Sequence, residues 1–394
     1  MSIKCDVLVV GGGPAGAVAS LNLAKKNIDV VLVEKNSNIG SHTNVKIDVT
    51  PQDTIDNIIK ELKLKHNGIG KKSVWYSPNG KKFLMESEVG EYYFKRGSDE
   101  DSFEKITINS ALDYNCNLVN NVNIKDMRKE KETYITNLDN GQKIKSKYLI
   151  GADGNNSIVR NIFLGISVGK ELFAYGISSY DFDIDHGTSS VFFDADMIPG
   201  GYIYLVKGNT GLSSAGIVLD PSKINQKPEK IFEKFFQNNK EFGNKIKGEK
   251  ITKFCGMGCI GVLNNLQVEK LFFVGDAGRL ASPLFGYGMK AAILSGYLAS
   301  NTIINSINTS YKNIENYDKN CKELLKLQLS KSIAKSWERL ENNDLDLLFN
   351  IFRKVYEKNG HLSVIEKLKI YNLIRKNDKY KDLKNILDSF EEMA

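Results

Sequence analysis

The sequence has few of the residues that build disulfide-rich or metal-binding proteins. Among its 394 residues are five cysteines, four histidines and two tryptophans. The cysteines are too scattered for a disulfide framework. Cys255 and Cys259 form a single C-x-x-x-C pattern with no second pair and no nearby histidine, so a zinc site is not expected, and we expect no other metal. A local redox pair or a disulfide between these two cysteines stays open.

Long apolar segments and concentrated charge are also missing. No apolar run reaches the length of a membrane span, and the first apolar stretch lacks a signal-peptide cleavage site. The formal net charge of +7 is spread among many lysines. It suits simple solubility or a mild attraction to anionic membranes. No arginine-rich, aromatic-interleaved segment points to nucleic acid. We expect a cytoplasmic protein without a nucleic-acid partner, and peripheral membrane contact stays open.

The first 34 residues carry the pattern of a dinucleotide-binding unit. An apolar strand at 6–10 leads into Gly11-Gly-Gly13-Pro-Ala-Gly16, a helix-like run follows, and a second apolar strand ends at Glu34. Gly11 permits a tight turn, Gly13 lets backbone amides approach a pyrophosphate, and Gly16 allows close packing of helix on strand. Glu34 stands where a carboxylate can accept hydrogen bonds from a ribose. The order of these parts predicts a dinucleotide-binding domain.

Periodicity along the rest of the chain predicts an α/β protein with a large antiparallel part. The composition, 41% hydrophobic and 26% charged, is that of a folded chain long enough for two or three domains. Residues 165–260 favour a mostly antiparallel sheet, and the lysine-rich C-terminal part favours helices packed over the body. Expected helices cover 17–27, 51–62, 102–115, 231–238 and 289–304; expected strands cover 117–124, 133–138, 145–150 and 270–274, with a hairpin at 73–94.

Two later segments each place an aspartate after an apolar strand. Segment 148–160 contains Gly-Ala-Asp153-Gly, and segment 271–289 contains Gly-Asp276 followed by a proline and two glycines. A carboxylate at a strand end can hold a ribityl or ribose hydroxyl. The helix that we expect to start at Met289 offers backbone amides to flavin ring oxygens or to phosphate.

These three segments together resemble the FAD flavoproteins of the p-hydroxybenzoate hydroxylase fold and, among them, the geranylgeranyl reductase family. Ala277-Gly-Arg279 is closer to the Ala-Ala-Arg of the reductases than to the Ala-Ala-His of the hydroxylases. Ile39-Gly-Ser41 is also similar to the reductases, and Arg96 matches an arginine that the family places near the flavin. Residues 199–206 resemble the motif Pro-x-x-Tyr-x-Trp-x-Phe-Pro that lines the lipid cavity, with strict agreement at the proline and the first tyrosine.

The resemblance implies FAD as cofactor and an α/β (α+β) fold in three parts. A Rossmann-like FAD-binding domain takes 1–70, 95–165 and 265–305, an antiparallel-sheet substrate domain takes 71–94 and 166–264, and a helical region takes 306–394. The implied FAD contacts are Gly11, Gly13, Pro14, Ala15, Gly16, Glu34, Lys35, Gly40, Ser41, Val45, Arg96, Val122, Asp153, Gly275, Asp276, Gly286, Gly288 and Met289. The implied substrate contacts are Tyr202, Tyr204, Phe192 and Pro283, with Phe193 and Ile203 as further candidates for the cavity wall.

One departure from the family concerns catalysis. Many archaeal reductases carry a cysteine beside the flavin shortly after the Ile-Gly-Ser segment, whereas this chain reads His42-Thr-Asn-Val45. A mechanism that uses this thiol does not carry over, so the catalytic residues stay unknown. His42, or a water bound near the flavin, is the candidate proton donor.

The resemblance implies an FAD-dependent reductase of carbon–carbon double bonds in polyprenyl chains of membrane lipids or related isoprenoids, with hydride from reduced flavin N5. Two alternatives stay open: an FAD-dependent monooxygenase or epoxidase of an apolar substrate, and a non-catalytic protein that binds flavin or prenyl lipid. The chain has no second G-x-G-x-x-G. The electron donor is therefore either a ferredoxin-like protein or transiently docking NAD(P)H.

Overall fold

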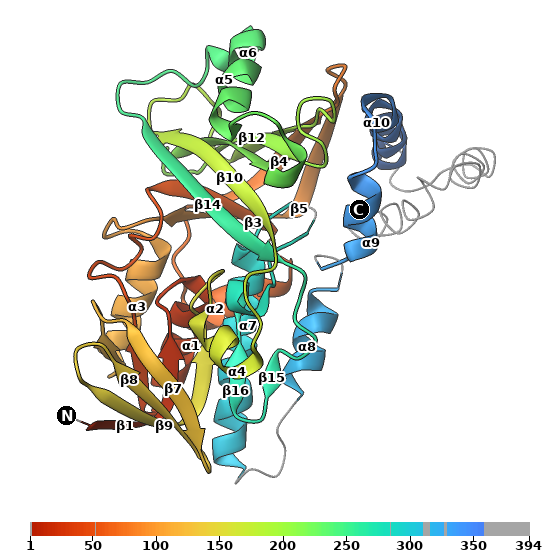
Figure 1. Ribbon diagram of the computed structural model, residues 1–394. Helices are drawn as coiled ribbons and strands as arrows, with labels where there is room; N and C mark the ends of the chain where they lie inside the picture. The colour runs from red at the N-terminus through yellow and green to blue at the C-terminus, as the bar shows by residue number, and fades with distance from the viewer. Residues whose placement is uncertain (1, 52, 284, 310–315, 327–328, 358–394) are drawn as a thin grey trace.

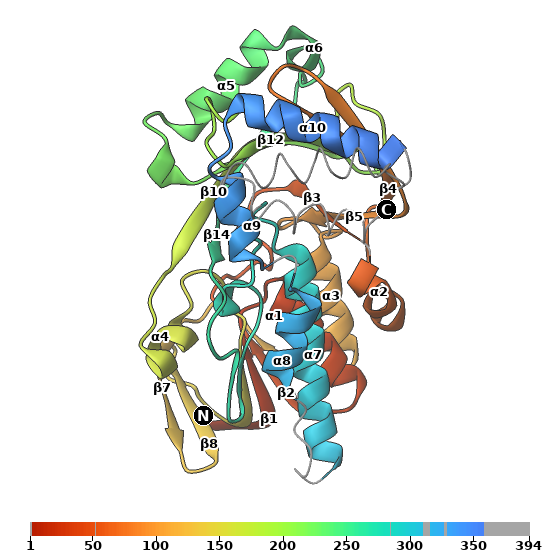
Figure 2. The same ribbon diagram turned by 90° about the vertical axis from the view of Figure 1, so that its right-hand side faces the viewer.

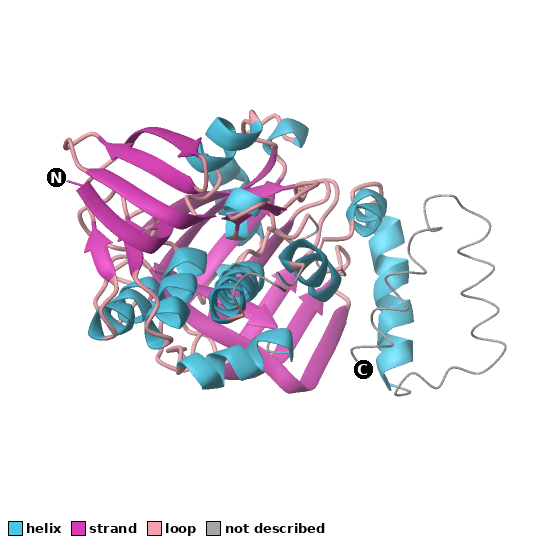
Figure 3. Cartoon of the chain, turned by 90° about the horizontal axis from the view of Figure 1, so that it is seen from below, coloured by secondary structure: helices cyan, strands magenta, loops and turns pink. Residues whose placement is uncertain are grey.

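Two eight-stranded sheets, one above the other, organise the chain (Figure 1). The computed structural model describes residues 2–51, 53–283, 285–309, 316–326 and 329–357. Figure 3 shows the strands in two groups with helices beside them. Among the described residues, no helix combines the length and the apolarity that crossing a membrane requires.

The first sheet contains the predicted dinucleotide-binding unit. Its order is β15-β16-β9-β1-β2-β6, and the β7–β8 hairpin pairs with β9. β1 runs parallel to both β2 and β9, and α1 packs against α3 and α7. The strands are β1 (Ser2–Val10), β2 (Val30–Val33), β6 (Asn117–Val119), β7 (Ile124–Glu130), β8 (Thr133–Leu138), β9 (Lys143–Gly151), β15 (Gln267–Val268) and β16 (Leu271–Phe273). The helices are α1 (Pro14–Lys25), α3 (Phe103–Asp113), α4 (Ile158–Leu164) and α7 (Met289–Asn308).

The second sheet confirms the antiparallel prediction, with one exception. Its order is β14-β10-β13-β12-β11-β4-β5-β3, and only β11 and β4 pair in parallel. The strands are β3 (Lys46–Pro51), β4 (Ile69–Tyr76), β5 (Lys82–Arg96), β10 (Lys170–Ser179), β11 (Thr188–Phe192), β12 (Tyr202–Lys207), β13 (Ser213–Leu219) and β14 (Thr252–Ile260).

Different helices cover the two faces of this second sheet (Figure 2). α5 (Pro228–Asn238) and α6 (Lys240–Gly243) bury phenylalanines against one face. The other face packs against α9 (Lys331–Trp337) and α10 (Asn342–Glu357), while α8 (Tyr317–Leu324) packs on α7. On that face lies a group of rings that we call the aromatic cluster: Trp75, Phe193, Tyr202, Phe285, Trp337 and Phe349.

The boundary between the predicted domains runs differently at one strand. From the sequence we expected no strand of the second sheet before residue 70. In the structure, β3 pairs with β5 and so belongs to this sheet. Strand β3 is short and lacks a clear alternation of apolar and polar residues, because two of its side chains are charged and point into the site described below. The helix expected at 51–62 accordingly begins later, as a 3-10 turn η1 (Asp53–Ile55) followed by α2 (Asp56–Leu62). Part of the predicted helical region, 358–394, lies outside the described residues.

Two smaller expectations also change. The strand predicted at 117–124 is divided, because β6 ends at Val119 and β7 begins at Ile124. Cys255 and Cys259 are both free and lie four residues apart on the continuous strand β14, one exposed and one buried. A separation of about 13 Å along a strand excludes a disulfide between them.

Candidate functional site

The glycine turn after β1 leaves open space in front of helix α1. Gly11 has φ of 104°, and the backbone of Ala152 lies against it where a side chain would stand. Gly16 brings α1 onto the Gly11 carbonyl in the same way. Gly13 differs, since no atom lies within 4 Å of the position that its Cβ would take. The turn is therefore closed on the sheet side and open at the helix N-terminus, where backbone amides favour an anionic group.

Glu34 follows β2 directly and borders this open space. Its carboxylate accepts hydrogen bonds from the backbone N–H groups of Gly12, at 2.8 Å, and Asn36, at 2.9 Å. The backbone N–H of Val122 donates to the Glu34 carbonyl at 3.4 Å, and Lys35 beside it is exposed. The structure thus brings Glu34, Lys35 and Val122 together at one end of the parallel strands.

Asp276 supplies a second carboxylate, on the turn η3 (Gly275–Gly278). No described residue donates a hydrogen bond to it, and burial raises its pKa to about 6 despite the nearby cations Arg96, Lys46 and Arg160. A Cβ on Gly288, just before α7, would come within 3.4 Å of Asp276 Oδ1. The carboxylate therefore faces the start of α7 with its acceptor oxygens available to a ligand.

Asp153 is used differently, within its own turn. Its carboxylate accepts from the Ser157 hydroxyl at 2.6 Å and from the Val159 N–H at 3.1 Å, which caps α4. Arg160 of that helix is fully buried and donates to the Ala277 carbonyl at 3.1 Å. The segment around Asp153 therefore fixes the turn that carries Asp276, while its carboxylate is already occupied by local donors.

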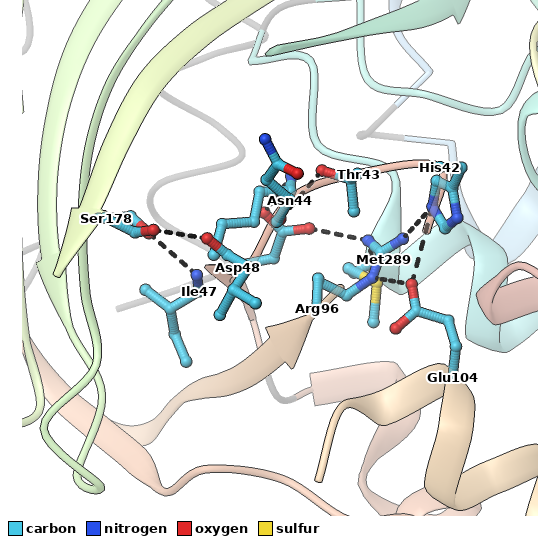
Figure 4. A network of polar contacts seen from close by, with 12 residues as sticks. His42, Thr43, Asn44, Ile47, Asp48, Arg96, Glu104, Ser178 and Met289 are labelled. Carbon is cyan, nitrogen blue, oxygen red and sulfur yellow. Dashed lines mark hydrogen bonds and ion pairs between the residues drawn. The ribbon is translucent and has the colours of Figure 1, made fainter. Parts of the chain in front are cut away.

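A buried ionic network surrounds Arg96 at the end of β5 (Figure 4). Arg96 Nε donates to Glu104 Oε1 at 2.5 Å, and Nη1 donates to Asp48 Oδ2 at 2.8 Å and to Met289 Sδ at 3.2 Å. Glu104 is fully buried and Arg96 is 9% exposed. Burial raises the pKa of Glu104, although Arg96 opposes the rise. At Asp48, Lys46 and Arg96 outweigh burial and hold the pKa below its usual range.

His42 lies beside this network but is not suited to donate a proton. Its Nε2 is 3.3 Å from Arg96 Nη2 and 3.8 Å from Glu104 Oε1. Although the His42 side chain is 40% exposed, desolvation and the cations Arg96, Lys46 and Lys35 lower its pKa to about 3. The imidazole is therefore neutral at physiological pH, so His42 is a poor candidate for the general acid that the sequence suggested.

Comparison with known proteins decides the cofactor. Two family models, both described as an FAD binding domain, match residues 6–45 and 109–331, and the second match alone spans more than half of the chain. This chain belongs to the FAD-binding domain family. It is an FAD-dependent oxidoreductase, and the features above fit that cofactor, because the open space at Gly13 and the available oxygens of Asp276 suit phosphate and hydroxyl groups.

Relatives of this FAD-binding protein agree with the predicted resemblance to geranylgeranyl reductases. Digeranylgeranylglycerophospholipid reductase of Methanosarcina acetivorans is 26% identical over 375 residues, covering 89% of each chain. The enzyme of the same name from Methanosarcina mazei is 26% identical over 394 residues, covering 93% of each.

Solved structures show the same fold. A geranylgeranyl bacteriochlorophyll reductase-like protein of Thermoplasma acidophilum superposes with a TM-score of 0.75 at 20% identity, covering 100% of both chains. A probable FAD-dependent monooxygenase of Pseudomonas aeruginosa has a TM-score of 0.65 at 15% identity, covering 88% of this chain and 100% of its own. At these identities the likeness concerns the fold alone.

The other predicted FAD contacts lie at the start of α1 and in loops that contact strands of the second sheet. Pro14 and Ala15 open α1, and the Ala15 Cβ would lie 3.1 Å from a Cβ on Gly275. Gly40 packs on Gly97 at the end of β5, with φ of 83°. Ser41 bonds back to the Asn38 carbonyl, Val45 accepts from the Ser178 hydroxyl, and Gly286 and Gly288 lead into α7 at Met289.

The structure corrects the placement of Phe192 among the predicted substrate contacts. Tyr202 and Tyr204 share one face of β12, and Pro283 is buried in the loop that precedes Phe285. Phe192 stands opposite Ile203 in the β11–β12 register, so both point to the other face and pack beneath α5. Phe193, one residue on, lies in the aromatic cluster instead. Strand alternation separates the two phenylalanines, and the sequence does not fix its phase.

The acidic partners of Arg96 are the residues that the sequence prediction missed. Glu104 lies on the inner face of α3 with Thr107, Ile108 and Ala111, and this spacing of three, four and seven residues was a usable signal. A predicted buried arginine also requires acidic partners. Asp48 gave no such signal, because β3 itself was not expected.

Proposed function

We propose that this protein reduces carbon–carbon double bonds in the geranylgeranyl chains of glycerophospholipids. The observation that carries the proposal is the aromatic cluster beside the FAD-binding loop. The Tyr202 hydroxyl donates to the Phe285 carbonyl at 2.5 Å, and the ring of Phe285 lies 5.8 Å from Tyr202 and 5.7 Å from Trp75. An apolar aromatic wall thus joins the loop that leads to Met289, and the names of the relatives supply the chemical class of substrate.

Reduced FAD, when bound, supplies the hydride. The protein must exclude water and hold the reacting groups in place, because an isolated alkene has no polar group that the protein could bind by hydrogen bonds. Tyr202 is 7% exposed and Phe193 2% exposed, so their rings are shielded from water. Arg96 is held by Glu104 and Asp48 in one position, and a fixed, buried cation stabilises negative charge that develops beside it.

Glu91 is our candidate for the proton source. Burial raises its pKa to about 7, although a hydrogen bond from Ser189 at 3.1 Å opposes the rise. The Ser189 and Ser73 hydroxyl oxygens lie 2.8 Å apart, so Ser189 can accept from Ser73 while it donates to Glu91, and Ser73 in turn accepts from Trp75 of the aromatic cluster at 3.1 Å. A carboxyl group with this pKa carries a proton to give near neutral pH. We expect Glu91→Gln to lower turnover strongly while FAD binding is unchanged; equal turnover of both proteins would remove Glu91 from the mechanism.

Rapid mixing of the reduced protein with lipid tests the function itself. Without oxygen, a geranylgeranyl glycerophospholipid is expected to reoxidise the flavin, and the matched lipid with saturated chains is not. If both lipids leave the flavin reduced and oxygen alone reoxidises it with oxygen inserted into the lipid, the protein is a monooxygenase. Lipid binding without any reoxidation would indicate a non-catalytic carrier.

The electron donor and the membrane contact belong to the same proposal. We expect a ferredoxin-like protein or NAD(P)H to reduce the flavin, and we expect the protein to meet its lipid at the membrane surface. Comparing the two donors for the rate of flavin bleaching in the purified protein separates them.

A further inference from the structure

Most of the net positive charge comes from one short part of the chain. Residues 60–82 contain seven lysines and one glutamate, a formal charge of +6, whereas the whole chain carries +7. Acidic residues flank this stretch on the same elements, among them Asp56 before it and Glu86 and Glu91 after it. We call these seven side chains, all exposed, the basic surface: Lys60, Lys63, Lys65, Lys71, Lys72, Lys81 and Lys82.

The basic surface runs from the end of α2 along strand β4 to the start of β5, near the tip of the β4–β5 hairpin. Two of its lysines are paired: Lys60 with Asp56, and Lys72 with Glu86 at 3.2 Å. No described acidic side chain pairs with the others, namely Lys63, Lys65, Lys71, Lys81 and Lys82. Most of the positive charge is thus available to an external anion.

A cavity of about 530 Å³ opens within this surface. Lys60, Lys63 and Lys65 line it together with Asp56, the partner of Lys60, and with apolar side chains that include Ile59 and Leu64. Lys63 has φ of 56°, a left-handed conformation that favours glycine, and its N–H bonds to the Lys60 carbonyl at 3.3 Å. The cavity therefore combines ammonium groups with an apolar lining, which suits an amphiphile with an anionic head better than a free inorganic ion.

The β4–β5 hairpin connects this surface with the proposed substrate region. Trp75 and Phe83 of the hairpin are buried in the same core as Tyr202, whereas Lys71 and Lys81 are exposed and Leu84 is 45% exposed. One hairpin thus presents aromatic rings inward and cations with an apolar side chain outward. Exposed lysines of this kind are attracted to the anionic headgroups of a lipid bilayer.

We infer that the basic surface is the membrane contact of this protein and binds the headgroups of anionic phospholipids. The inference rests on the proposed function, because an enzyme that acts on bilayer lipids must reach the bilayer. The apolar cavity lining and the exposed Leu84 favour a lipid surface over an acidic protein as the partner.

Vesicle sedimentation tests the inference. The protein is mixed with phosphatidylcholine vesicles, with or without phosphatidylglycerol, and Lys63→Gln/Lys65→Gln is compared with Lys4→Gln/Lys131→Gln, a matched pair of exposed lysines outside the basic surface. Each lysine near an anionic surface contributes about a fivefold factor, so we expect the first pair to lower the partition coefficient about 30-fold and the control pair to leave it nearly unchanged. Binding of the unmodified protein should also weaken steeply with added salt.

The contrary results are distinct. Equal binding of the two double variants, or equal binding to vesicles with and without phosphatidylglycerol, would overturn the inference. So would a variant that keeps vesicle binding but loses reduction by a ferredoxin-like donor, because the surface would then serve a protein. Turnover of a prenyl lipid dispersed in detergent is measured in parallel. If that turnover is absent in every protein while the vesicle difference persists, the proposed function fails and the membrane contact stands.

Discussion

Replacing Arg96 by methionine should destabilise the protein by about 3 kcal/mol at about pH 7.5. The value depends on which cations remain beside Asp48 and Glu104 when Arg96 is removed. Asp48 retains Lys46 at 2.7 Å, so it still has a cation. Glu104 is fully buried. Among the described side chains, the other base within reach of it is His42, and the lowered pKa of His42 leaves its imidazole uncharged. The loss therefore reflects one orphaned buried carboxylate, the lower end of the range for a broken buried pair.

The pH dependence of this loss has a definite sign. Burial already raises the pKa of Glu104, and without Arg96 it should rise further. A carboxyl group whose folded-state pKa lies above its unfolded value favours folding less as pH increases, by up to about 1.4 kcal/mol per pH unit. The defect of Arg96→Met relative to the unmodified protein should therefore shrink when the pH is lowered to about 5.5, where the carboxyl takes up a proton.

Urea unfolding of the FAD-free proteins at the two pH values measures the effect. Arg128→Met is the matched control, because Arg128 pairs with Glu130 at 2.7 Å on the surface, where such pairs contribute roughly 0–1 kcal/mol. If Arg96→Met costs no more than Arg128→Met, or if its cost does not depend on pH, the account of a buried ionic network around Arg96 is wrong.

Three further predictions concern the cofactor and the substrate. Gly13→Ala should weaken FAD binding at least tenfold, whereas the control Gly256→Ala should not. A Cβ meets no atom at either position, so the two changes fit the protein equally well. Equal FAD affinities of the two variants in titrations would contradict this prediction. Asp276→Asn should stabilise the FAD-free protein in thermal unfolding, because no buried charge remains, yet lower its FAD affinity. Phe193→Ala and Phe192→Ala should each cost about 3 kcal/mol of stability, and only Phe193→Ala should raise the KM for lipid.

The sequence predicts the glycine turn and its flanking strands well, because their requirements act through the backbone. Gly11 and Gly16 are required by close approach of main chain, and Glu34 follows a strand of four apolar residues, so the pattern and the geometry coincide. Element types were also recoverable, as in the β4–β5 hairpin and in α7, because their apolar periodicity is strong.

Prediction from sequence fails where a property depends on the packing of distant segments. The phase of β11 decides whether Phe192 or Phe193 meets the aromatic cluster, and that phase is set by pairing with β12. Asp48, one partner of Arg96, comes from β3, 48 residues earlier in the chain. His42 looks like an acid in the sequence, but desolvation and the cations that the fold brings around it lower its pKa to about 3.

The mass of the lipid recovered after anaerobic turnover tests the central claim most directly. The FAD-loaded protein is reduced with dithionite, mixed with a geranylgeranyl glycerophospholipid in the absence of oxygen, and the lipid is extracted for mass spectrometry. The account predicts a gain of two hydrogens for each double bond lost and no gain of oxygen. An unchanged lipid mass after complete flavin reoxidation, or a product that carries added oxygen when air is admitted, would contradict it.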